Sequence, residues 1–177
     1  KGTTTVDLLT NDTVQVNAVV PQSLTFSISS NSISFGNLGS GFVKYASSTN
    51  TAGDTASTSA HNLQIGTNAP SGYTVTVQGQ TLTSQQNSNN TITAIGNTPA
   101  AISMGTEQFG IYATKSGGIN GTIDATYSTL SAFGYDATAT TSATFASGTS
   151  STNTETFLLY YIANIAPLTE AGTYSAS

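Results

Sequence analysis

The chain has a single histidine, His61, which is the first residue to consider for catalysis. A Ser–His–Asp triad needs this imidazole beside a hydroxyl and a carboxylate. Its neighbours Ala60, Asn62 and Leu63 instead fit the start of a strand at the edge of a loop. No G-x-S-x-G, H-E-x-x-H or phosphate-loop pattern occurs. The sequence therefore predicts that the protein is not an enzyme and that His61 is an exposed structural residue.

The eight acidic residues are the second group that could do chemistry, and they are widely scattered. A glycosidase needs two carboxylates close together, usually beside aromatic residues that hold the sugar, and the chain has no tryptophan. A calcium site needs clustered oxygen ligands, so only a weak surface site stays open as an alternative. We predict solvated loop acids, no metal site and no cofactor. The acids are Asp7, Asp12, Asp54, Glu107, Asp124, Asp136, Glu155 and Glu170.

Lysine and asparagine side chains offer modification chemistry. Lys44 or Lys115 could form an isopeptide crosslink with an asparagine beside a buried acid. Lys44 fits this role better, because Lys115 lies in the turn-like sequence K-S-G-G; an ordinary exposed lysine is the alternative. Three N-x-[ST] sequons provide candidate glycosylation sites at Asn11, Asn89 and Asn120.

Composition limits the function further. Charged residues make up 6% of the 177 residues, against about 25% in an ordinary soluble domain. The formal net charge is −5 with three basic residues, which excludes a basic patch and therefore nucleic-acid binding. No apolar run is long enough for a membrane span. Because such composition is typical of exported surface proteins, we expect a secreted or cell-surface protein whose signal peptide has been removed.

Alternation of apolar and polar residues runs through most of the sequence and predicts strands with one face in a core. The clearest examples are Val14–Ala18, Leu24–Ile28 and Tyr73–Val77. The segment Phe157–Ala163 is apolar on both faces, which favours a central strand. Further strands are predicted at Ile33–Leu38, Leu63–Thr67, Thr91–Ile95 and Gln108–Ala113.

Two regions, Ala46–Ala60 and Ala137–Thr154, alternate weakly and are predicted as long loops or edge strands, and Gly121–Gly134 could hold the only helical turn. Short strands separated by Gly, Asn, Pro and Ser clusters are typical of a sandwich. We therefore predict an all-β, immunoglobulin-like β-sandwich of the Greek-key or jelly-roll type over residues 14–177. Residues 1–13 form an N-terminal extension. The chain has no cysteine, so this core must hold without disulfides.

Four stretches of the sequence occur together in a characteristic order. They are V-N-A-V-V-P-Q-S-L-T-F-S-I-S (16–29), G-Y-T-V-T-V-Q-G (72–79), T-E-Q-F-G-I (106–111) and Y-Y-I-A-N-I-A-P-L-T-E-A-G-T-Y-S (160–175). Together they resemble secreted bacterial immunoglobulin-like β-sandwich surface proteins, including subunits of donor-strand filaments. In such proteins the strand that starts here at Tyr174 normally continues, whereas this one stops at Ser177. The resemblance therefore implies an open groove that is an aggregation hazard unless filled, because its strand edges are unpaired. Either the last strand was cut, or another chain supplies one.

The N-terminal segment Thr3–Thr10 could supply that strand, with Val6, Leu8 and Leu9 as the inserted side chains. Strand addition joins subunits in donor-strand pili, and its head-to-tail repetition gives an open filament. We expect a structural subunit of an extracellular pilus-like filament or surface layer, a homopolymer whose partners are copies of itself. The alternative is a surface-displayed adhesin or carbohydrate-binding module that binds host or environmental glycans through the loops 46–60 and 137–154.

Overall fold

The computed structural model describes residues 1–5 and 14–177. Over these residues the protein is all-β, with antiparallel sheets and one short helix, which confirms the predicted class and is consistent with a β-sandwich. The elements are β1 (Leu24–Ile28), β2 (Lys44–Tyr45), β3 (His61–Thr67), β4 (Tyr73–Val77), β5 (Thr83–Ser84), β6 (Gly96–Ala100), β7 (Gln108–Ser116), β8 (Gly121–Ile123), α1 (Ala125–Ser128), β9 (Phe133–Tyr135), β10 (Ala143–Gly148), β11 (Thr152–Asn164) and β12 (Tyr174–Ser175).

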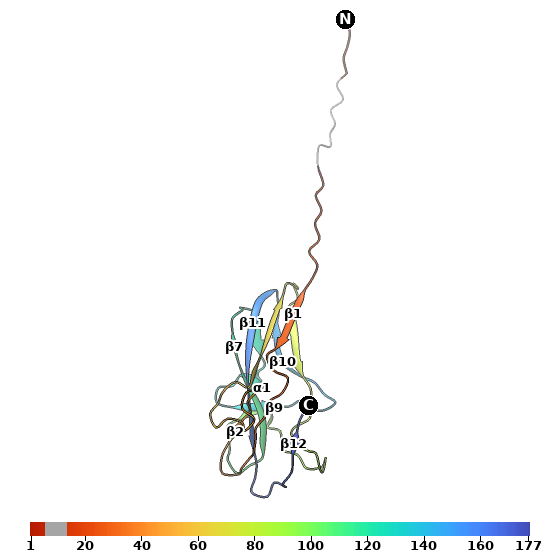
Figure 1. Cartoon of the computed structure of the whole chain (residues 1–177). Helices are drawn as coiled ribbons and strands as arrows, with labels where there is room; N and C mark the ends of the chain where they lie inside the picture. Colours follow the sequence, from red (N-terminus) through yellow and green to blue (C-terminus); the bar gives the residue numbers. More distant parts are fainter. Residues whose placement is uncertain (6–13) are drawn as a thin grey trace.

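The larger sheet has seven strands in the order β1-β3-β11-β7-β9-β6, with β2 also paired to β11 (Figure 1). The long strand β11 lies between β3 and β7, and its pairing with β7 is continuous from Thr156 to Asn164. The inward side chains Phe157 and Leu159 are buried. The predicted central strand over Phe157–Ala163 is therefore confirmed.

The smaller sheet has three strands in the order β4-β10-β8, and it packs on the larger sheet through Phe145 of β10, whose ring centroid lies 6.1 Å from that of Phe157. The prediction of a loop or edge strand over Ala137–Thr154 is wrong for β10, because β10 is the centre of this sheet. A register shift between Thr144 and Ala146 interrupts the alternation that would have revealed the strand. A separate two-stranded ribbon joins β12 to β5.

Whether the other predicted strands form depends on whether a partner strand is available. The predictions at Leu24–Ile28 and Tyr73–Val77 are confirmed as β1 and β4. The prediction at Val14–Ala18 is wrong, since residues 14–22 are fully exposed and belong to no strand. Alternation alone does not form a strand, because each extended backbone needs a neighbour to satisfy its N–H and C=O groups.

Two further strand predictions are wrong for local reasons. The segment Ile33–Leu38 makes only an isolated bridge at Ser34, because Gly36 has φ +63° and breaks the extended conformation. The segment Thr91–Ile95 crosses between elements, pairing with the β5 region through Thr91 and with β7 through Ala94. The segment therefore connects the β5 region to β7 and does not extend either sheet as a strand.

The helical turn predicted within Gly121–Gly134 is confirmed as α1. Asp124 caps it by accepting a hydrogen bond from the main-chain N–H of Thr126 at 2.9 Å. The helix buries Tyr127 against Phe145, with ring centroids 5.4 Å apart. No helix in the described part of the chain is long and apolar enough to cross a membrane.

Candidate functional site

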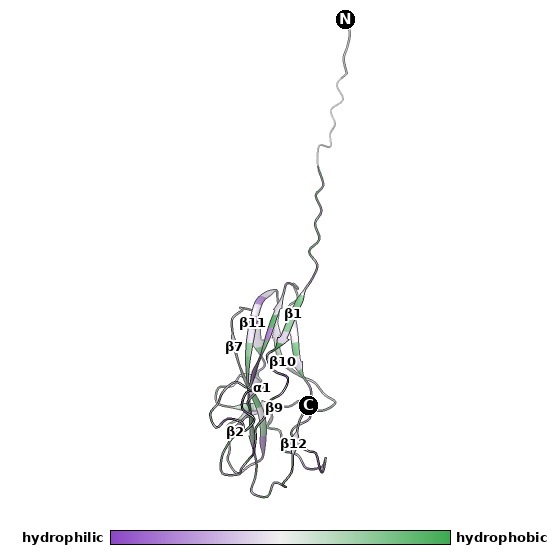
Figure 2. Ribbon diagram, viewed as in Figure 1, coloured by the Kyte–Doolittle hydropathy of each residue, from purple (hydrophilic) through white to green (hydrophobic). Residues whose placement is uncertain are grey.

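One side of the fold leaves a row of core-facing apolar side chains uncovered. On the edge strand β1, Phe26 is directly opposite Ile65 of β3, and partners in an antiparallel pair share one face of the sheet. Ile65 is 1% exposed, whereas Phe26 is 53% exposed. Its neighbours in the same row, Leu24 and Ile28, are exposed by 63% and 48%. In Figure 2, β1 carries green, apolar residues that alternate with paler ones.

The row is uncovered because the smaller sheet stops at β4. The backbone of β4 pairs with β10 on one side, and no strand among residues 1–5 and 14–177 pairs with its other edge. That free edge borders the open side, and Val75 and Val77 of β4 are only partly buried. We call the space between β1 and the free edge of β4 the open lane.

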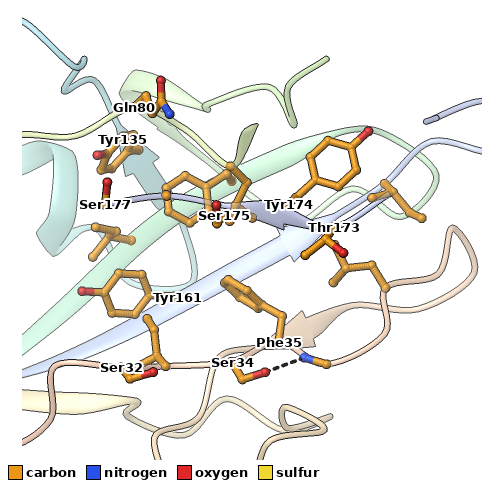
Figure 3. A pocket seen from close by; sticks show the side chains of 18 of the residues that line it. Ser32, Ser34, Phe35, Gln80, Tyr135, Tyr161, Thr173, Tyr174, Ser175 and Ser177 are labelled. Carbon is orange, nitrogen blue, oxygen red and sulfur yellow. Dashed lines mark hydrogen bonds between the residues drawn. The ribbon is translucent and has the colours of Figure 1, made fainter. Parts of the chain in front are cut away.

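A groove of about 1040 Å³ lies at one end of the open lane. Ile28 and the segment 30–38 form one wall, and residues 77–82 contribute to the other. The segment 173–177 also lines the groove; Figure 3 shows it passing between Phe35 and Tyr161 on one side and Gln80 and Tyr135 on the other. The apolar lining is completed by Leu82, Phe109, Ile111 and Ile165.

The same chain carries an exposed apolar segment. Residues 14–22 extend away from the body at the end where β1 begins (Figure 1). In this segment Val14, Val16 and Val20 are each more than 80% exposed. Beta-branched residues that alternate with polar ones favour a strand once a partner edge is available. The chain therefore presents an unpaired strand edge and an unpaired strand-forming segment together.

His61 lies in the wall of the groove, at the first position of β3 as its neighbours predicted. It is partly buried rather than exposed: its Nε2 lies 2.8 Å from the hydroxyl of Tyr161, and the two rings are stacked with centroids 5.5 Å apart. Burial lowers the pKa of His61. Its Nδ1 is buried without a hydrogen-bond partner among the described residues. These contacts hold the imidazole neutral as part of the wall.

Glu155 corrects the prediction that the acids are solvated loop residues. It lies on β11 and its side chain is fully buried between the two sheets. The hydroxyl of Tyr73 donates a hydrogen bond to Oε2, and the main-chain N–H groups of Gly121 and Asn120 donate to Oε1 at 2.7 and 3.1 Å. The ammonium of Lys115 lies 3.5 Å from Oε1. Burial by itself raises the pKa of Glu155, but these donors outweigh it and hold the pKa below its usual value.

The candidate isopeptide lysines lie in different surroundings. Lys115, which sequence placed in a turn, is the lysine that reaches a buried acid. Lys44, the better sequence candidate, donates to the carbonyl of Ala52 at 2.8 Å. Near Glu155 the side-chain amide of Asn120 points elsewhere and donates to the carbonyl of Ser151 at 2.7 Å. The cluster is therefore arranged to neutralise a buried charge rather than to join a lysine to an asparagine.

The remaining predicted site residues fall in separate places. The donor candidates Val6, Leu8 and Leu9 and the sequon residue Asn11 lie outside the described residues. Asn89 is exposed in the turn after β5. Within the described residues, no three histidine, aspartate or glutamate side chains gather where they could hold a metal ion.

The outer face of the larger sheet carries a second surface feature. Tyr112 of β7 lies opposite Tyr160 of β11, with ring centroids 5.5 Å apart, and both rings are partly exposed. The neighbouring outward positions on β1, β3, β7 and β11 are neutral. They are Thr25, Ser27, Asn62, Gln64, Thr114, Thr156 and Leu158.

Comparison with protein-family models, curated proteins and solved structures gives no match. Function must therefore be inferred from the features of the chain itself. Three of them bear on it: the open lane with its groove, the exposed N-terminal segment, and the neutral outer face around Tyr112 and Tyr160.

Proposed function

We propose that the protein is a structural subunit of an extracellular filament or surface layer, and that subunits join by β-strand donation. The observation that carries this proposal is the presence, in one chain, of an open apolar lane and of an exposed apolar segment suited to a strand. The immunoglobulin-like Greek-key topology predicted from the sequence belongs to the same proposal. A sandwich of that kind with an unfilled strand position accepts a donated strand.

Burial of the uncovered apolar side chains provides the driving force for strand donation. Each valine, leucine, isoleucine or phenylalanine side chain that passes from water into a core contributes roughly 1.5–3 kcal/mol. Donation would cover Leu24, Phe26 and Ile28 on the acceptor and valines on the donor in one step, and it would satisfy an unpaired strand edge. An isolated subunit leaves both surfaces in water. Assembly therefore removes two unfavourable exposed surfaces of the described fold.

Head-to-tail donation also explains why the product would be a polymer. The donated segment and the open lane are different surfaces, so each subunit can give a strand to one neighbour and accept one from another. Such an interface does not close on itself unless the rotation between neighbours forms a ring. The low charge, 6% of residues, favours dense packing because like-charged neighbours in a polymer repel. The same composition supports an extracellular location.

Electron microscopy and size-exclusion chromatography of the purified chain test the proposal. The intact chain should form filaments or a layer, and removal of residues 1–22 should leave a monomer. Removal of residues 1–5 alone is the matched control and should leave assembly intact. Strand donation from the N-terminal segment is wrong if the chain lacking residues 1–22 still polymerises.

A second candidate function, glycan binding by a surface-displayed module, is favoured by the neutral outer face of the larger sheet. Aromatic rings with hydroxyl and amide groups around them suit an uncharged sugar, which stacks on the ring and hydrogen-bonds to its surroundings. The Tyr112–Tyr160 pair has that setting. Binding of the purified chain to a glycan array, lost in Tyr112→Ala and Tyr160→Ala and retained in a Phe26→Ala control, would support this function. Absence of binding to any neutral glycan would exclude it.

A further inference from the structure

The open lane is bounded by two unpaired strand edges, and only one of them lets an added strand cover the apolar row. A strand added to the outer edge of β1 would extend the larger sheet sideways and leave Leu24, Phe26 and Ile28 exposed. A strand added to the free edge of β4 would lie in the smaller sheet, facing the inner side of β1. An added strand can therefore cover the apolar row only if it pairs with the free edge of β4.

Part of this strand position is already occupied by the chain itself. The ribbon partner β12 pairs with β5 at Tyr174 and Ser84, antiparallel to the segment that leads out of β4. Farther along, the carbonyl of Ser177 lies close to the backbone of Gly79, and a side chain at Gly79 would collide with it. Within residues 1–5 and 14–177, the stretch beside residues 79–84 is thus filled, and no strand pairs with Tyr73–Val77 on this edge.

The exposed segment matches the empty stretch in length and in pattern. Residues 14–20 read V-Q-V-N-A-V-V, seven residues against the five of β4. In an extended strand Val14, Val16, Ala18 and Val20 share one face. That face would meet the apolar row of β1, and Gln15, Asn17 and Val19 would face solvent. The alternation over Val14–Ala18 is the pattern that a half-buried strand needs.

The segment is anchored to the body at its C-terminal end. Asn68, in the loop after β3, accepts from the N–H of Ser23 at 2.7 Å and donates to the carbonyl of Pro21 at 2.9 Å. Thr67 donates to the carbonyl of Ser23 at 2.7 Å. These bonds fix the chain at the entry to β1 with the preceding residues directed away from the body (Figure 1). A return of residues 14–20 into the lane beside β4 would require the chain to reverse its direction next to these anchored residues.

We infer that the open lane takes residues 14–20 of a second copy of this chain, paired with the free edge of β4 and with Val14, Val16, Ala18 and Val20 against the apolar row of β1. This inference rests on the proposed function and changes its donor. The sequence assigns donation to Val6, Leu8 and Leu9, which lie outside the described residues. The exposure, alternation and length of residues 14–20 support donation by the segment that follows them.

Charge placed on the two faces of the segment tests this donor directly. Val16→Asp and Val20→Asp should abolish assembly of the full chain, because a carboxylate cannot enter the apolar row. Gln15→Asp and Asn17→Asp are matched controls on the solvent face and should assemble as the wild type does. Equal assembly by all four variants would overturn the assignment to residues 14–20 and leave strand donation by an earlier segment standing.

Disulfide trapping locates the acceptor edge. Because the chain has no cysteine, only the introduced cysteines can form disulfides. Thr76 is exposed on β4, and its partner Thr144 is exposed on β10, on the side of β4 away from the lane. Cysteine at Thr76 combined with cysteine at Asn17 or Gln15 should give disulfide-linked multimers under mild oxidation. The same donor cysteines combined with Thr144→Cys should give at least tenfold less. Equal linkage at both positions would exclude the free edge of β4 as the acceptor.

A peptide experiment separates this inference from the proposed function. A synthetic peptide of residues 14–22 should bind the full-length Val16→Asp variant, measured by calorimetry, and Val16→Asp in the peptide should weaken binding about tenfold or more. If the wild-type chain never assembles, the structural-subunit function is wrong. If the chain assembles and the peptide does not bind, residues 14–20 are not the donor.

Discussion

The hydroxyl of Tyr73 on β4 donates a hydrogen bond to the carboxylate of Glu155 on β11, so one buried contact ties the smaller sheet to the larger one. Both residues are buried. Burial raises the pKa of Tyr73, and the adjoining carboxylate raises it further, so the phenol stays protonated and keeps its role as donor. The contact lies at the first residue of β4, and it holds that strand in place without a disulfide.

Removal of this hydroxyl should destabilise the fold. Tyr73→Phe leaves the buried carboxylate with one donor fewer, and loss of a hydrogen bond to a charged group costs about 1–3 kcal/mol. Urea denaturation monitored by circular dichroism gives the free energy of unfolding. Tyr112→Phe, which removes a hydroxyl on the outer sheet face, is the matched control and should change stability by less than about 0.5 kcal/mol. Equal losses in the two variants would contradict the inter-sheet role of Tyr73.

Glu155 should determine how the free energy of unfolding declines at acidic pH. Its folded pKa lies below the ordinary value of 4.5, so the unfolded chain binds the proton more readily. The stabilisation is complete above about pH 4.5 and is lost as the pH falls through the lower folded pKa. Glu155→Gln should lower stability at pH 7 and flatten the decline below pH 5. Urea midpoints measured from pH 7 to pH 3 check this, and an unchanged slope in the variant would count against it.

His61 should titrate below its ordinary pKa of 6.5, because burial beside Tyr161 disfavours the charged ring. The neutral form is favoured in the folded state, so its contribution to stability is complete above about pH 6.5 and falls as the pH drops through the folded pKa. Since the chain has one histidine, its imidazole Cε1–H signal in proton NMR needs no assignment. A midpoint above 6.5 would contradict the buried setting.

Two phenylalanines on the same face of the larger sheet should respond differently to truncation. Phe157→Ala empties a fully buried position and should cost about 3–5 kcal/mol. Phe26→Ala removes a half-exposed ring and should cost much less in the monomer. In the assembled protein the loss caused by Phe26→Ala should become large, because Phe26 lies in the row that a donated strand covers. Comparing denaturation of dilute monomer with the critical concentration for assembly separates the two outcomes.

Much of the fold could be predicted from alternation, and the failures follow from long-range partners. Alternation predicts the strands Leu24–Ile28 and Tyr73–Val77 correctly, because each alternates and each has a neighbour. Val14–Ala18 alternates equally well and has no partner in the described chain, which no local pattern can reveal. Alternation does not predict β10, because its bulge and small residues hide the periodicity.

The candidate site was harder to predict than the strands. The apolar row of β1 was predicted to face a core, and its exposure depends on where the smaller sheet stops. The burial of Glu155 had a usable signal: it shares the two-residue spacing of Phe157 and Leu159, which places it on the inward face of β11. Because the chain has few charged residues, Glu155 is predicted to be a solvated acid instead. The positions of its donors on three other elements could come only from the tertiary structure.

Three side-chain hydrogen bonds of Thr67 and Asn68 with the main chain of Pro21 and Ser23 hold the chain where residues 14–22 leave the body. Figure 1 shows the segment continuing the direction of β1. Tension applied along the segment would therefore act parallel to the β1–β3 ladder, whose hydrogen bonds run perpendicular to the strands. The paired positions from Leu24 to Ile28 would be loaded in shear together instead of opening one at a time, so the joint would resist pulling as a single mechanical unit.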